Sequence, residues 1–166
     1  MVLRVLALAL VICFSLFPLG RSNAQSSGPD AVVKTLYGYY GIGSNSGKTG
    51  LTEQNAAVVL TPALLTLYKK AVASGALDAD FFVQGQDFSL VKPVEINKVA
   101  IVHSTANVSA TLSQNDLDRK GNAIVRVDYF IFLLAKDNNG WRIYDAFCHG
   151  NSLTDEWEAA VKEGNK

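Results

Sequence analysis

Cysteine and histidine are scarce in this sequence, with two residues of each type among 166. Cys13 lies in an N-terminal apolar run that we expect to be removed, so Cys148 would be left as a single thiol without an internal disulfide partner. Cys148 lies in an apolar stretch, where a thiol is usually buried and inert. Two histidines and one cysteine do not supply a convincing zinc ligand set. The sequence therefore predicts no metal site and no cofactor.

An excess of positive charge is also absent. The chain has 15 basic and 15 acidic residues, which gives a formal net charge of +0. Removal of residues 1–24 would take away Arg4 and Arg21, leaving 13 basic residues against 15 acidic ones and a net charge of −2. Nucleic acids and anionic membrane surfaces attract proteins through clustered positive charge. We therefore expect neither of them as a partner.

A phosphate-binding loop is missing too, although residues 41–50 read GIGSNSGKTG. That motif requires a glycine, four residues and then Gly-Lys-Ser/Thr, so that consecutive backbone N–H groups surround the phosphates. Ile42 occupies the position that requires glycine, because Gly41 comes one residue too early and Gly43 one residue too late. The residues before the loop also have helical spacing, whereas the motif follows a buried strand. We interpret 41–50 as a flexible loop between helices.

The first 24 residues have the pattern of a cleaved secretory signal. A basic start, MVLR, precedes the apolar run VLALALVICFSLFPL, and Ser22-Asn23-Ala24 supplies small residues before the expected cleavage. The run is short for a membrane span. We expect an exported protein, periplasmic or extracellular, without a stable membrane anchor. The remaining residues, 25–166, suit a single domain with its own core.

Helical periodicity dominates the first half of this domain. Apolar residues recur at helical spacing in PDAVVKTLYGYY, and TEQNAAVV predicts a shorter helix. In LTPALLTLYKKAVASG, Thr61 is expected to be the N-cap, Pro62 the first helical residue and Gly75 the end. Near the C-terminus, Ser152 and Asp155 in SLTDEWEAAVKEG have the spacing of a capping box.

The period changes to two after Val91, which indicates strands. Four strand regions are expected, covering 94–101, 106–112, 122–136 and 141–150. Short turns join them, so the sheet should be antiparallel. The predicted fold class is α+β: N-terminal helices packed on a curved antiparallel sheet of about four strands, with a short C-terminal helix.

The segment LDADFFVQGQDFS holds three carboxylates around an aromatic pair. An EF-hand would need more ordered ligands, a central glycine and a closing glutamate, which this segment lacks. Asp78 and Asp80 are expected to cap a short turn while Phe81 and Phe82 enter the core. Asp87 stays a candidate site residue because it lies where the chain enters the sheet.

The third and fourth strands contain the strongest candidates for a site. If Lys136 pairs with Trp141, the facing pairs on one side of the sheet are Leu134 with Ile143, Phe132 with Asp145, Phe130 with Phe147, and Asp128 with His149. A bulge at Gly140 would shift this register by one residue.

Two chemical interpretations follow from this register. Asp145 would lie among aromatic rings, which raise the pKa of a carboxyl group, and Asp128 could orient His149 as a general base. The alternative is that the strand ends are solvated and Asp145 hydrogen-bonds a backbone group. His103 is expected to be a surface or hydrogen-bonded histidine.

Four stretches resemble a family of small exported bacterial proteins of unknown function: AVVKTLYGYY, LTPALLTLYKKA, LDADFFVQGQDF and GWRIYDAFCHGNSL. The resemblance covers most of residues 29–160, and the loop at 41–50 departs from it. That family is thought to adopt the nuclear transport factor 2-like, or cystatin-like, cone. The resemblance implies a curved sheet whose concave face forms a pocket closed by the N-terminal helices. It brings no catalytic motif, so fold alone does not assign an activity.

Three functions remain open from the sequence. The first is a non-catalytic binding domain, monomeric or homodimeric, that holds a small molecule in the pocket or docks another protein. The others are an immunity-type partner of an exported toxin and an enzyme that uses Asp145 with His149 or a tyrosine in proton transfer. No residue is assigned as catalytic. The candidate ligand-binding residues are Tyr37, Tyr40, Asp87, Asp128, Asp145 and His149.

Overall fold

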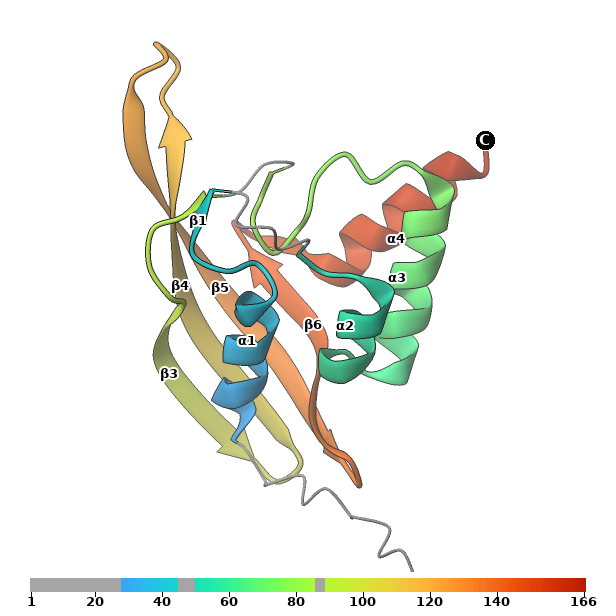
Figure 1. Cartoon of the computed structure of the whole chain (residues 1–166). Coiled ribbons are helices and arrows are strands. Elements are labelled where there is room, and N and C mark those ends of the chain that lie inside the picture. The colour runs from blue at the N-terminus through green and yellow to red at the C-terminus, as the bar shows by residue number, and fades with distance from the viewer. Residues whose placement is uncertain (1–27, 45–49, 86–88) are drawn as a thin grey trace, which may run out of the picture.

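A computed structural model describes residues 28–44, 50–85 and 89–166. The expected signal peptide (1–24), the centre of the loop at 41–50 and the candidate Asp87 lie outside the described residues. The fold is α+β, with helices on one face of a curved antiparallel sheet, as the sequence predicts (Figure 1).

The four long strands lie where the period-two pattern indicates them: β3 (Glu95–Val102), β4 (Thr105–Leu117), β5 (Ala123–Asp137) and β6 (Gly140–Cys148). Three two-residue strands extend the sheet: β1 (Gly43–Ser44), β2 (Ser89–Leu90) and β7 (Asn151–Ser152). The order is β1-β2-β4-β5-β6-β7, and β3 also pairs with β4. The described part of the sheet therefore has seven strands rather than about four, because three are too short to show a periodicity.

The helices are α1 (Pro29–Gly38), α2 (Glu53–Val59), α3 (Pro62–Ser74) and α4 (Leu153–Gly164). The predicted caps are confirmed, because Thr61 Oγ1 accepts a hydrogen bond from Leu64 N and Ser152 Oγ accepts one from Asp155 N. Gly75 ends α3 with φ +69°, a left-handed conformation that suits glycine. None of the helices in the described part of the chain has the length and apolar character needed to cross a membrane.

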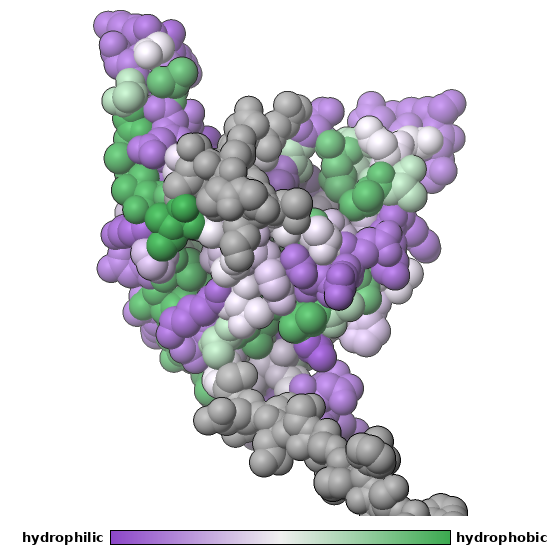
Figure 2. Space-filling model, in the orientation of Figure 1, coloured by the Kyte–Doolittle hydropathy of each residue, from purple (hydrophilic) through white to green (hydrophobic). Residues whose placement is uncertain are grey.

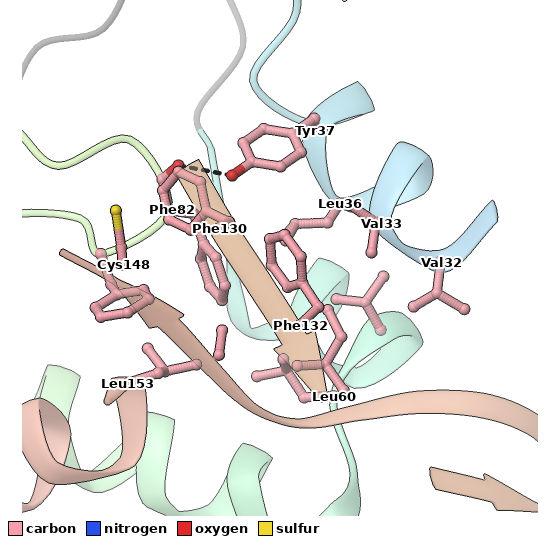
Figure 3. Close-up of a cluster of buried hydrophobic side chains, with 14 of the residues drawn as sticks. Val32, Val33, Leu36, Tyr37, Leu60, Phe82, Phe130, Phe132, Cys148 and Leu153 are labelled. Carbon is pink, nitrogen blue, oxygen red and sulfur yellow. Dashed lines mark hydrogen bonds between the residues drawn. The ribbon is translucent and has the colours of Figure 1, made fainter. Parts of the chain in front are cut away.

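Aromatic rings fill the space between α1 and the sheet (Figure 3). Tyr37 from α1 lies 6.2 Å, between ring centroids, from both Phe130 and Phe132 on β5. Phe82 stacks on Phe132 at 6.2 Å, which confirms its predicted place in the core. Cys148 is buried as expected, and burial raises the pKa of its thiol to about 12. The concave side of the sheet is therefore densely packed here.

The predicted register between β5 and β6 is correct only near the turn. Lys136 pairs with Trp141 and Leu134 with Ile143, as expected. A shift then follows, so that Phe132 faces Ala146 and Phe130 faces Cys148, and the predicted pairs of Phe132 with Asp145 and Phe130 with Phe147 are wrong. The extra residue is Tyr144, which is exposed, and not Gly140. The bulge lets β6 continue to bury small side chains against the core.

The hairpin of β4 and β5 extends beyond its neighbouring strands (Figure 1). The two strands pair from Thr105–Ala135 to Leu117–Ala123, whereas β3 pairs with β4 only up to Thr111 and β6 first pairs at Phe130. Residues 115–125, called the arm below, pair only with each other within the described strands. The Asp118 side chain closes its turn by accepting hydrogen bonds from the backbone of residues 120 and 122.

Candidate functional site

A groove of about 550 Å³ lies between α1 and the segment that joins β2 to β3. This volume is within the range of small-molecule sites, roughly 300–1,000 Å³. One side of the groove comes from the last turn of α1 and the residues after it, and the other side comes from Leu90, Pro93 and Val94. The lining is mainly apolar and consists of Lys34, Tyr37, Gly38, Gly41, Ile42, Leu90, Pro93 and Val94.

Tyr37 is one of the residues that line the groove, and its hydroxyl is bonded within the core. The hydroxyl donates a 3.0 Å hydrogen bond to the carbonyl oxygen of Phe82, as Figure 3 shows. Burial raises the pKa of this hydroxyl well above its usual value, so it stays a neutral donor. The sequence-predicted Tyr37 therefore lies at the groove, and its hydroxyl already has a partner in the core.

Lys34 brings a charged group to the groove. Its ammonium lies 2.9 Å from the Asp30 carboxylate, one helical turn earlier, and holds the pKa of Asp30 below its ordinary value. The Lys34 side chain is 57% exposed. Exposed pairs of this kind contribute little to stability, so Lys34 is free to exchange Asp30 for an acidic group on a ligand.

Tyr40 is not among the residues that line the groove. It is hydrogen-bonded to Asp80, a residue for which the sequence predicted only a role in a turn. Its hydroxyl donates a 2.7 Å hydrogen bond to Asp80 Oδ2, while Asp80 Oδ1 accepts one from Phe82 N. Burial raises the pKa of Asp80, although both hydrogen bonds lower it. Asp80 also borders a cavity of about 190 Å³ with Tyr68 and Trp157. The predicted turn role of Asp80 is confirmed, and its partner Tyr40 was missed.

Asp128 lies at the base of the arm and is buried, with 1% of its side chain exposed. Its carboxylate accepts hydrogen bonds from Gln114 Nε2 (2.9 Å), Arg126 Nε (3.0 Å) and His149 Nε2 (2.9 Å). Burial raises the pKa of Asp128, but the hydrogen bonds from His149, Gln114 and Arg126 outweigh it, so the pKa is lower than usual. The expected proximity of Asp128 and His149 is present in the structure.

Arg126 connects this carboxylate to the loop that follows the aromatic pair. Its guanidinium binds Asp116 at 2.7 Å and donates to the carbonyl oxygen of Val83 at 2.8 Å. Gln114 donates to the same carbonyl at 2.8 Å. The network thus joins three chain segments, while the His149 side chain is 56% exposed. Both oxygens of the Asp128 carboxylate accept hydrogen bonds, so its role is to stabilise the contact between these segments.

Asp145 pairs with Leu133 and not with Phe132, so the predicted pairing that would have placed its carboxyl group among aromatic rings is wrong. Its carboxylate accepts hydrogen bonds from Ser152 Oγ (3.0 Å), Thr154 N (3.1 Å) and Thr154 Oγ1 (3.0 Å). It therefore caps the N-terminus of α4, where a negative charge is favourable. The bulge at Tyr144 causes this change, because it turns Asp145 away from the core. The alternative of a backbone hydrogen bond is confirmed, and a proton-transfer pair of Asp145 with His149 or a tyrosine loses its basis.

Asp145→Ala is expected to lower the free energy of unfolding by about 1–2 kcal/mol, because α4 loses its acceptor at Thr154 N. The measurement is equilibrium unfolding in urea. Glu158→Ala, on the exposed side of the same helix, is the matched control and should change stability by less than about 0.5 kcal/mol. Equal stabilities of the Asp145→Ala variant and the wild type would contradict the capping role.

No protein-family model and no curated protein matches the chain. The solved structures that show similarity include the following two. The intermembrane space region of the chloroplast protein ARC6 has 17% sequence identity and a TM-score of 0.46, and the match covers 74% of this chain and 94% of that one. A phospholipid-binding protein from Ralstonia solanacearum, solved with a phospholipid, has 13% identity and a TM-score of 0.34, with coverage of 78% and 60%. Both TM-scores are low, and we take no functional conclusion from either structure.

Proposed function

We propose that the protein is a non-catalytic binding protein that holds a small, mainly apolar ligand in the groove between α1 and the start of β3. The observation that carries this proposal is a groove of about 550 Å³ with a mainly apolar lining. The ligand would lie against Tyr37, Leu90 and Val94, which line the groove. An acidic group on the ligand would pair with Lys34 at the groove. A carboxylic acid with an apolar tail has both properties.

We also propose that this binding takes place outside the cytoplasm, after removal of residues 1–24. The support is the basic start, apolar run and small-residue cleavage pattern of the sequence. We propose further that the chain has the nuclear transport factor 2-like fold. Its support is the sequence resemblance together with the element order of helices, then strands, then one helix.

Native mass spectrometry of the protein purified from its own cells tests both proposals directly. The mass of the chain gives the first residue after processing. An added mass of a few hundred daltons, lost on denaturation, would identify a bound small molecule. A chain that carries no added mass and binds no apolar acid in solution would contradict the ligand proposal, whatever its first residue.

Gly38→Trp is expected to block the groove without unfolding the protein. Gly38 is the last residue of α1 and lines the groove, and a Cβ atom built there meets no heavy atom within 4 Å. Binding of the apolar anion anilinonaphthalene sulfonate, measured by fluorescence titration, should weaken at least about tenfold, which corresponds to about 1.4 kcal/mol.

Gly38→Ala is the matched control for this variant. It adds one methyl group and favours the helix by about 0.5–1 kcal/mol, so it should bind the probe like the wild type. Equal probe affinity in Gly38→Trp, with an unchanged melting temperature, would show that the probe binds outside the groove.

A further inference from the structure

The cavity of about 190 Å³ beside Asp80 is separate from the groove, because the two share none of their described lining residues. Its lining comes mainly from α3, α4 and the segment between α3 and β2, and the two helices lie side by side in Figure 1. Figure 2 shows apolar surface at the end of α3, where this segment begins. The described lining residues are Leu51, Tyr68, Val72, Leu77, Ala79, Asp80, Phe81 and Trp157.

Asp80 brings an unbalanced charge to this cavity. It alone is charged among the described lining residues. Its carboxylate accepts hydrogen bonds from the Tyr40 hydroxyl (2.7 Å) and from Phe82 N (2.9 Å), and both donors are neutral. In the part of the chain that the structure describes, no basic side chain forms an ion pair with it. A carboxylate offers about four acceptor sites, so Asp80 has acceptor capacity left for a ligand.

The negative charge of Asp80 also affects the groups around the cavity. The pKa of Glu156 on α4 is raised by burial and by the charge of Asp80. Burial raises the pKa of Tyr68 to about 12, together with the charges of Asp80 and Glu53. Both effects have the sign of a negative potential, which disfavours a further negative charge. A cation in the cavity would therefore be favoured.

Aromatic residues surround this charge. Tyr68, Phe81 and Trp157 all line the cavity and are buried. The rings of Tyr68 and Trp157 have centroids 5.1 Å apart and are tilted by 45°. The Tyr68 hydroxyl is held by a 2.6 Å hydrogen bond to the carbonyl oxygen of Leu51. Aromatic rings attract a cation within about 6 Å of their centroids, and groups of such rings recognise quaternary ammonium ions.

The lining distinguishes between kinds of cation. Calcium and magnesium ions take several oxygen ligands, and no group of three or more His, Cys, Asp or Glu residues in the described ranges could hold a metal ion. A primary ammonium has three N–H donors to satisfy, whereas Asp80 is the one carboxylate among the described lining residues. A quaternary ammonium has no N–H donor, and its methyl groups suit apolar neighbours such as Val72 and Leu77.

We propose that this cavity binds the quaternary ammonium group of a small organic cation, with Asp80 as the counter-ion and Tyr68, Phe81 and Trp157 as aromatic neighbours. The volume corresponds to about six water molecules at roughly 30 Å³ each, which suits a trimethylammonium group with a short tail. Val72 is 46% exposed and borders the cavity, so the ligand can enter from solvent on that side.

Isothermal titration calorimetry with choline tests the proposal. The matched ligand is dimethylbutanol, the neutral analogue in which a carbon atom replaces the charged nitrogen. The wild type should bind choline at least about tenfold more tightly than the neutral analogue, because the shapes agree and only the charge differs.

Two variants locate the site. Asp80→Asn removes the charge with little change of shape and should weaken choline binding at least about tenfold. Asp78→Asn is its matched control, because Asp78 is exposed and is not among the lining residues.

Val72→Trp fills the cavity from the exposed side of α3 and should also weaken choline binding at least about tenfold, so the test does not depend on the folding of Asp80→Asn. Val58→Trp is its matched control: Val58 is 50% exposed on α2 and does not line the cavity. Both control variants should bind choline like the wild type.

Several outcomes would overturn the proposal. One is a wild type that binds choline no more tightly than the neutral analogue, or binds neither. Another is wild-type affinity for choline in folded Asp80→Asn or Val72→Trp. A third is displacement of choline by an equal concentration of potassium ions, because the occupant is then an inorganic cation. Anilinonaphthalene sulfonate binding should be unchanged in Val72→Trp, and choline binding unchanged in Gly38→Trp, so the groove and this cavity are tested separately.

Discussion

Phe132→Ala is expected to lower the free energy of unfolding by about 4 kcal/mol, the largest effect that we predict for a single substitution. Phe132 has no exposed surface, and its ring contacts Tyr37, Phe82 and Phe130 at centroid distances of 5.7–6.2 Å. Truncation removes the transfer free energy of the ring and also leaves a cavity. The cavity cannot collapse easily, because the Tyr37 hydroxyl is tied to the backbone of Phe82. Urea unfolding measures the loss.

Tyr144→Ala provides the comparison for this prediction. Tyr144 is an aromatic residue of the neighbouring strand, but it is 40% exposed at the bulge. Its truncation should cost less than about 1 kcal/mol, since surface substitutions have small effects. A loss at Phe132 no larger than the loss at Tyr144 would mean that the aromatic cluster does not form the centre of the core.

Asp128→Ala is expected to cost about 3 kcal/mol. The substitution removes a buried acceptor of three hydrogen bonds, so that the buried Gln114 amide keeps only its bond to Val83 and the Arg126 Nε–H loses its acceptor. Removal of one member of a buried charged network costs more than the net contribution of the pair, because the remaining groups stay desolvated. The loss is measured by urea unfolding at neutral pH.

His149→Asn separates this structural role from a role of the exposed histidine. His149 has φ +51°, and asparagine tolerates that conformation better than most residues. The imidazole is more than half exposed, so its loss should cost less than about 1 kcal/mol. If His149→Asn is as destabilising as Asp128→Ala, the histidine and not the buried network holds the base of the arm.

The same network predicts a loss of stability in acid. The folded-state pKa of Asp128 is lower than its unfolded value, which is about 3.9. The folded state therefore binds the proton more weakly, and the stabilisation is fully present above the unfolded pKa. It disappears as the pH falls from the unfolded pKa through the folded pKa. In unfolding curves measured over this range, Asp128→Asn should show a weaker dependence on pH than the wild type.

Much of the fold follows from local sequence. Pro62 and Gly75 mark the two ends of α3, and Ser152 is the N-cap of α4, because proline, glycine and a capping hydroxyl act on the backbone of their own neighbours. The period-two pattern likewise located all four long strands. The candidate site was harder to predict. Asp128 and His149 were expected to meet and do, although the register that placed them together is shifted before it reaches them.

The sequence alone determined the helix boundaries, the four long strands, the fold class and the buried face of β5, because each depends on neighbouring residues or on a short period. Only the tertiary structure decided the position of the bulge, and with it the place of Asp145 at the start of α4. It also decided the pairing of Tyr40 with Asp80, the bonds of Arg126 to Val83 and the groove beside Tyr37. The two side-chain contacts join residues 40 or more positions apart in the sequence. The bulge and the groove depend on how whole elements pack. A local sequence pattern predicts neither kind of feature.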